Sequence, residues 1–123
     1  MQILFSLEPT DIDDPLDIDP LGDITLLEGE EKLTESSVYL DSWFNAIEKG
    51  AVKIENESKA EIDLIEEPQP LIFNRSSSGV RISFKEKSLT IKNMDDLRTA
   101  VKRAREELIS TQVFPTGYGS RPK

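Results

Sequence analysis

Residues 71–91 read LIFNRSSSGVRISFKEKSLTI, and this stretch decides the fold. Apolar side chains alternate with polar ones in three short runs: Leu71 and Phe73; Val80, Ile82 and Phe84; Leu89 and Ile91. Alternation with a period of two is typical of a β-strand that buries one face. Two clusters of turn-forming residues, 76–79 and 85–88, separate the runs. The stretch therefore predicts an antiparallel meander with one apolar face.

The alternation continues upstream of this meander. Pairs of apolar residues at period two predict two more strands: Val52 and Ile54; Ile62 and Leu64. Nearer the N-terminus, Gln2–Leu7 and Asp23–Leu27 have strand composition. The second of these ends at Glu28-Gly29-Glu30-Glu31, and Ser37–Leu40 fits the start of either a strand or a helix.

Two segments have helical periodicity instead. Leu40, Trp43, Phe44 and Ile47 recur at i, i+3, i+4 and i+7, which predicts a short helix with Asp41 or Ser42 as N-cap and Gly50 as the glycine that ends it. We expect Trp43 and Phe44 to be core residues. A longer helix is predicted from the N-cap Asn93, and its apolar stripe is Met94, Leu97, Val101, Ala104 and Leu108.

These elements predict an α+β fold. We expect a mostly antiparallel sheet of about five to seven strands, with one long C-terminal helix and one short helix on one face. Residues 1–114 are expected to form a single domain, in which 8–31 are an acidic, proline-containing extended loop and strand, and residues 115–123 to form a flexible tail.

Charge is distributed unevenly along the chain. The 123 residues hold 24 Asp and Glu against 15 Lys and Arg, a formal net charge of −9. Residues 8–31 hold ten acids and no base. Ten uncompensated carboxylates repel one another unless water or cations meet them. This segment is therefore the strongest functional signal in the sequence, although a merely solvated acidic loop explains it equally well.

Composition excludes several chemistries. The sequence holds no Cys and no His, so disulfides, thiolate or imidazole zinc sites and His-dependent catalysis are excluded. Residues 17–28 align in part with a calcium loop, but Leu21 stands where an oxygen ligand is required. Adjacent acids such as Glu66-Glu67 would point to opposite faces of a strand. We therefore expect no enzyme, no metal site and no cofactor.

The functional expectation follows from charge. A strongly acidic surface disfavours nucleic acid and anionic membranes and favours a basic protein. Small immunity proteins and antitoxins share this physical profile, so we expect a protein that binds and neutralises a basic partner such as a toxin or nuclease domain. The expected partner-binding carboxylates are Asp11, Asp13, Asp14, Asp17, Asp19, Asp23, Glu28, Glu30, Glu31 and Asp41.

The alternative is an assembly subunit that forms a homodimer through a sheet edge. No stretch reaches the ~20 apolar residues that span a bilayer, and the first residues lack the basic start of a signal peptide. We therefore expect a cytoplasmic location.

Overall fold

The computed structural model describes residues 1–7 and 20–113, with side chains up to Ser110. The described residues form seven strands and two helices, which confirms the predicted α+β class. The elements are β1 (Gln2–Leu7), β2 (Leu21–Glu28), β3 (Glu31–Tyr39), α1 (Leu40–Lys53), β4 (Lys59–Ile62), β5 (Leu71–Ser76), β6 (Gly79–Phe84), β7 (Lys87–Ile91) and α2 (Met94–Val113). The predicted loop over 8–19 and the predicted tail over 115–123 lie outside the described residues.

The strands form two antiparallel sheets. One has the order β1-β2-β3 and the other the order β4-β5-β6-β7, so each sheet is a meander of consecutive strands. The register of the second sheet, with Ile72 opposite Ser83 and Ile82 opposite Leu89, confirms the alternation in residues 71–91. In the described residues β3 contacts β7, but no strand ladder joins the two sheets.

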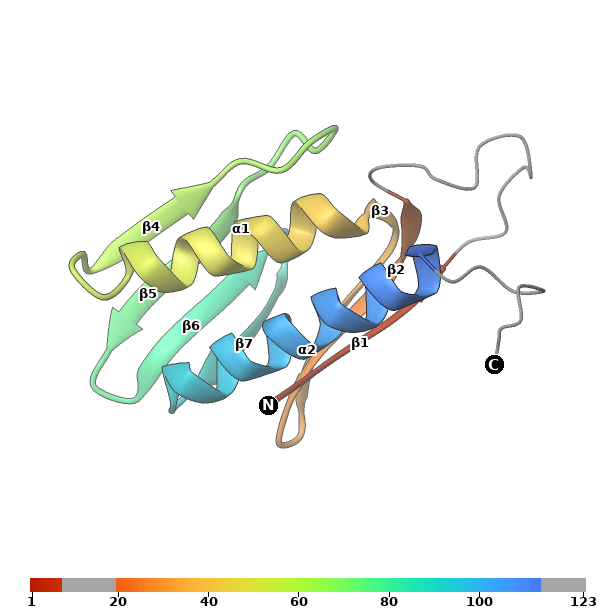
Figure 1. The fold of residues 1–123 in the computed structure, drawn as a ribbon. Helices are drawn as coiled ribbons and strands as arrows, with labels where there is room; N and C mark the ends of the chain where they lie inside the picture. Colours follow the sequence, from red (N-terminus) through yellow and green to blue (C-terminus); the bar gives the residue numbers. More distant parts are fainter. Residues whose placement is uncertain (8–19, 114–123) are drawn as a thin grey trace.

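The two helices lie side by side over the same side of the sheets (Figure 1). Helix α1 packs against β4 and β5, and α2 packs against α1 and β1. The core lies between the helices and the sheets, and its largest fully buried side chains include Trp43, Phe44, Phe73 and Phe84. The prediction that Trp43 and Phe44 are core residues is confirmed.

Helix α1 differs from its prediction at both ends. It begins at Leu40 with Tyr39 at the N-cap and no side-chain cap, so Asp41 lies in the first turn and is not the cap. It continues to Lys53, which places Val52 on the helix and Ile54 at its C-cap rather than in a strand. Tertiary packing overrides the local signal, because the buried face of the helix extends to Ala51 and Ile54.

Gly50 lies inside α1 and does not end it. A Cβ at this position would lie 2.0 Å from Cε1 of Phe73 on β5. The glycine is thus required by the close approach of helix and sheet, not by a left-handed cap conformation.

The region around residues 28–40 also differs from its prediction. Glu31–Tyr39 is a full strand, and Gly29 and Glu30 form the hairpin turn that connects it to β2. Gly29 has φ of 61°, a left-handed value suited to glycine. Because β2 is a strand through Glu28, the calcium-loop pattern over residues 17–28 does not form one continuous loop.

Helix α2 agrees with its prediction. The Asn93 Oδ1 accepts a hydrogen bond from the Asp95 amide at 2.9 Å, which is an N-cap contact. The stripe Leu97, Val101, Ala104 and Leu108 is buried, and Met94 is partly buried.

Candidate functional site

Residues 8–19 are connected to the described fold at one end of the three-stranded sheet. Leu7 and Gly22 are register partners in β1 and β2, so residues 8–19 leave and rejoin the described fold side by side. The Leu40 amide donates to the Pro20 carbonyl at 3.0 Å, which places the start of α1 at the same end. We call this end of the sheet the loop end.

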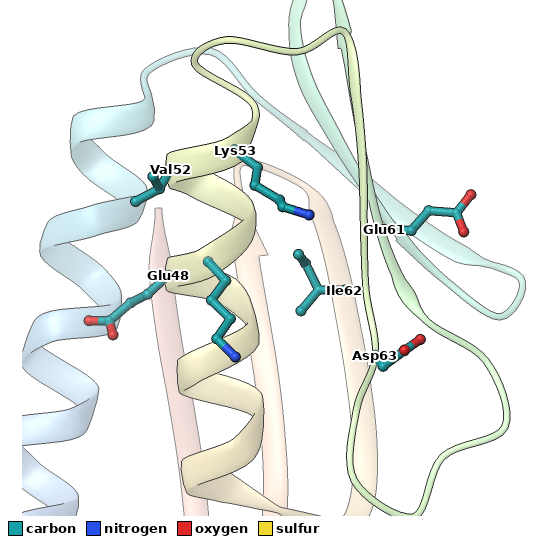
Figure 2. A pocket seen from close by; sticks show the side chains of 7 residues that line it. Glu48, Val52, Lys53, Glu61, Ile62 and Asp63 are labelled. Carbon is teal, nitrogen blue, oxygen red and sulfur yellow. The ribbon is translucent and has the colours of Figure 1, made fainter.

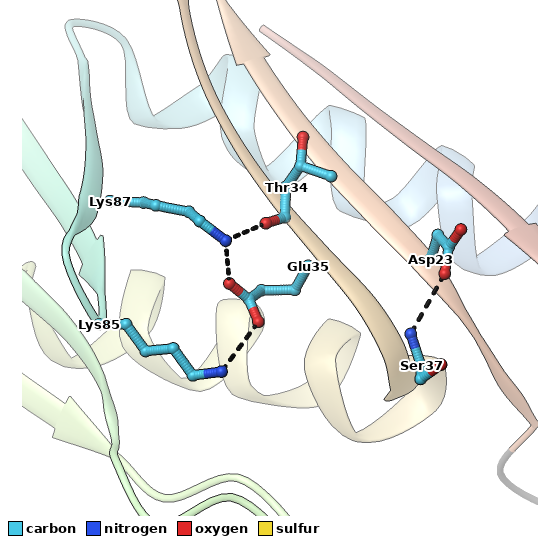
Figure 3. A network of polar contacts seen from close by, with 6 residues as sticks. All are labelled: Asp23, Thr34, Glu35, Ser37, Lys85 and Lys87. Atoms are coloured by element: carbon cyan, nitrogen blue, oxygen red, sulfur yellow. Dashed lines mark hydrogen bonds and ion pairs between the residues drawn. The ribbon is translucent and has the colours of Figure 1, made fainter.

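Two of the predicted partner-binding residues lie at the loop end. Asp23 in β2 lies opposite a β-bulge formed by Ser36 and Ser37 in β3, and its Oδ1 accepts a hydrogen bond from the Ser37 amide at 3.1 Å (Figure 3). Asp41 is in the first turn of α1; its Oδ2 accepts from Asn45 Nδ2 at 3.4 Å, and its Oδ1 lies 3.8 Å from Arg105 Nε. Both are half-buried, and both face the fold as well as solvent.

Three predicted residues lie at the opposite end, around the β2–β3 turn. Glu28 Oε1 lies 3.0 Å from the α-amino group of Met1. Glu31 Oε1 accepts a hydrogen bond from the Thr90 amide at 2.9 Å, and so satisfies a backbone group at the edge of β7. Glu30 is exposed in the turn.

The structure therefore does not bring the described acids into one patch. Asp23 and Glu28 are five residues apart on β2, which corresponds to about 17 Å at ~3.3 Å per residue. A distance of this size separates the two aspartates at the loop end from the three glutamates. The remaining predicted residues, Asp11, Asp13, Asp14, Asp17 and Asp19, lie outside the described residues.

A second polar cluster was missed by sequence reasoning. Glu35 on β3 is only 6% exposed. Its Oε1 accepts from Lys85 Nζ at 3.2 Å and its Oε2 from Lys87 Nζ at 2.5 Å, while Lys87 also donates to the Thr34 carbonyl at 2.7 Å (Figure 3). These contacts cross from β3 to the β6–β7 hairpin, so they bridge the two sheets. A signal existed: Glu35 follows Leu33 at period two and therefore occupies an inward-facing position.

The cluster adjoins the aromatic core. Trp43 and Phe84 pack edge to face with ring centroids 4.9 Å apart, and Lys85 Nζ lies 5.2 Å from the centroid of Phe84. The cation therefore contacts both a carboxylate and an aromatic face. Both oxygens of Glu35 are engaged by lysines, and this arrangement fits a structural bridge better than a proton acceptor.

Arginine side chains tie the two helices together. Arg105 of α2 is bonded to Glu48 and donates to the Asn45 Oδ1 at 2.6 Å. Arg98 pairs with Asp95 at 2.9 Å, as its helical spacing predicts, and also with Glu55 beyond α1. The basic face of α2 is thus partly used inside the fold.

A shallow groove of about 670 Å³ lies between α1 and β4 (Figure 2). Lys53 reaches from the helix toward β4, and Ile62 points from β4 toward the helix, whereas Glu61 and Asp63 on either side of Ile62 point away from the helix. Charges of both signs surround a small apolar surface, so the groove shows no preference for either charge.

Two kinds of feature are absent from the described residues. Among residues 1–7 and 20–113, no group of three or more Asp or Glu side chains is placed to hold a metal ion. Neither helix of that part of the chain is long and apolar enough to cross a membrane.

Comparisons with known proteins add no identification. No protein family, no curated protein and no solved structure matches the chain.

Proposed function

We propose that the protein is a non-enzymatic binding protein that captures a basic partner, and that it acts as an immunity- or antitoxin-type inhibitor of a toxin or nuclease domain. The observation that carries this proposal is the run of ten acids without a base in residues 8–31. Six of these acids fall in residues 8–19, which are attached at both ends to the loop end of the sheet.

Asp23 adds to the negative charge at the loop end, whereas Arg105, 3.8 Å from Asp41, compensates part of the charge of Asp41. The hydrogen bonds from Ser37 and Asn45 restrict the positions of the two carboxylates. A rigidly held carboxylate loses less side-chain entropy on binding than a free one. The loop end therefore combines fixed charges with the dense charge of the attached segment.

Electrostatic attraction of this kind acts mainly on the rate and selectivity of association. The charges of a basic partner are drawn toward a strongly acidic surface over distances of about one Debye length, ~10 Å at 0.1 M salt. Binding should therefore weaken as the salt concentration rises. Occlusion of a basic active site requires only complementary charge and shape.

The test is a pulldown from the native organism with the tagged full chain at low and moderately high salt, with bound proteins identified by mass spectrometry. One variant replaces Asp11, Asp13, Asp14, Asp17 and Asp19 with Asn. The matched control replaces five exposed acids outside residues 8–31, Glu57, Asp63, Glu86, Asp96 and Glu106, with Gln or Asn. Both variants carry the same net charge, so a difference in partner binding between them depends on where the removed charges lie in the chain.

We expect one basic protein to bind the unmodified chain and the control, and to be lost or strongly weakened with the first variant. Inhibition of the activity of the captured protein would then establish the inhibitor role. Equal binding by both variants would contradict the assignment to the acidic segment. Recovery of no basic protein at low salt would overturn the proposal.

A further inference from the structure

Strand β1 is an outer edge of the three-stranded sheet, and its composition is unusual. Among residues 1–7 and 20–113 it pairs only with β2, and its sequence QILFSL holds no charge, no Pro and no Gly. Every second residue of an edge strand turns its N–H and C=O groups outward, where another strand can pair with them. Leu4, in the middle of β1, is 50% exposed. Edge strands of monomeric proteins are usually protected by charges, bulges or shortness, and β1 has none of these.

The other outer edge in the described residues is protected. Strand β4 has four residues, and Lys59 and Glu61 form an ion pair at 3.1 Å along it. The edges of β3 and β7 face each other and are bridged by side chains, including the bond from the Thr90 amide to Glu31. Among the described strands, β1 is therefore the edge suited to further pairing.

We propose that β1 pairs antiparallel with β1 of a second copy of this chain, around a two-fold axis at Leu4. The two three-stranded sheets would then form one six-stranded sheet. This interface runs along β1, whereas the proposed basic-partner surface is at the loop end of the sheet.

In this register, the side chains of β1 are complementary to those of β1 in the second copy. On the face away from the helices, Leu4 lies opposite Leu4 of the second copy, and Gln2 lies opposite Ser6. On the helix-covered face, Ile3 lies opposite Phe5. Apolar residues thus meet apolar residues, polar residues meet polar ones, and no charge is opposed to a like charge. In an antiparallel pair, residues directly opposite each other point to the same face of the sheet. The helices of both copies would therefore lie on the same side of the combined sheet.

The space beside the strand is open. A groove of about 410 Å³ runs between β1 and α2, lined by residues 2–4, including Ile3, on the strand and by Thr99, Arg103 and Glu107 on the helix. Helix α2 therefore does not close the edge. Each copy carries a net charge of −9, so long-range repulsion opposes association and salt weakens this repulsion. The dimer should strengthen with salt, opposite to the capture of a basic partner.

The test measures the mass of the full chain in solution by light scattering over a range of concentration and salt. Leu4→Lys places two like charges opposite each other at the axis. Val52→Lys is the matched control, because Val52 is 61% exposed on α1 and the change in net charge is the same. An added lysine lowers the net negative charge, so general electrostatics would favour association and only the local contact opposes it.

We expect the unmodified chain and Val52→Lys to form dimers that increase with salt, and Leu4→Lys to be monomeric with an unchanged circular dichroism spectrum. Leu4→Glu should also be monomeric, while an equimolar mixture of Leu4→Lys and Leu4→Glu should recover the dimer, because opposite charges then meet at the axis. A chain that stays monomeric at every concentration and salt would overturn the proposal. So would a dimer that Leu4→Lys leaves intact.

Discussion

The sequence singles out Gly50 correctly as a required glycine of the first helix, but the predicted reason for it, the end of the helix, is wrong. A glycine after an amphipathic stretch is typical of a helix end. In the structure the helix continues through it, and the missing side chain makes room for Phe73. Sequence alone holds no signal for this contact, because Phe73 lies 23 residues further along the chain on another element.

Gly50→Ala should therefore destabilise the protein. In an ordinary helix interior this change stabilises by about 0.5–1 kcal/mol. Here the new Cβ would lie 2.0 Å from the Phe73 ring, and overpacking of this kind costs about 1–3 kcal/mol. Chemical denaturation monitored by Trp43 fluorescence measures the change in the free energy of unfolding.

Lys49→Ala is the control for that measurement. Lys49 is exposed on the same helix, so its replacement should change stability by no more than about 0.5 kcal/mol. A Gly50→Ala variant as stable as the unmodified protein would show that α1 and β5 do not approach as closely as described.

At the scale of elements, the junction of the two sheets depends on side chains. Strands β3 and β7 lie edge to edge, and Glu35 with Lys85 and Lys87 connects them without a strand ladder. Burial of the partners is unequal: Glu35 is nearly enclosed, whereas the side chains of Lys85 and Lys87 are 44% and 48% exposed. Because of this difference in burial, removal of the two lysines should reduce the stability of the fold more than removal of the Glu35 charge.

Replacing both Lys85 and Lys87 with Met should cost about 3 kcal/mol, because a buried carboxylate is left without a cation. Glu35→Gln should cost only about 1 kcal/mol, since both lysines can turn to water and the amide still accepts hydrogen bonds. Thermal and chemical denaturation of both variants check this order. The control replaces the exposed Lys32 and Lys92 with Met, which removes the same charge. A greater loss from Glu35→Gln would contradict the bridging role.

The elements themselves were largely predictable from periodicity. Residues 71–91 and the stripe of α2 alternate with clear periods of two and of three to four, and both form the predicted elements. The strand Glu31–Tyr39 was not found as such, because its own β-bulge at Ser36 and Ser37, where Ser37 is left-handed, interrupts its alternation. The division into two sheets depends on contacts between β3 and β7, which no local pattern encodes.

The candidate site was predictable only in part. The acidity of residues 8–31 is a property of composition and needs no structure. The described acids lie at two opposite ends of the sheet, and the strand register determines which acid lies at which end. The register of β1 and β2 cannot be read from the sequence and is given by the structure. Asp41 is brought to the loop end by the path of the chain between β3 and α1.

At the scale of the whole molecule, opposing electrostatic effects act on stability. Local ion pairs such as Glu35 with Lys87 stabilise the fold and are weakened by salt. The excess of 24 acids over 15 bases destabilises it by self-repulsion, which salt relieves. The Debye length falls from about 30 Å at 0.01 M to about 8 Å at 0.15 M, so salt removes long-range repulsion first and affects the short, partly buried pairs least.

The melting temperature should therefore rise between these two salt concentrations. Calorimetry at a low protein concentration, where the chain is a monomer, measures this change without a contribution from association. The variant with Asp11, Asp13, Asp14, Asp17 and Asp19 replaced by Asn should show a smaller rise, because five of the repelling charges are gone. The equally charged variant with exposed acids replaced elsewhere should show a rise between the two, since its acids are less crowded in the sequence. A melting temperature that falls with salt would mean that the ion pairs, and not the excess charge, dominate the electrostatic free energy of this fold.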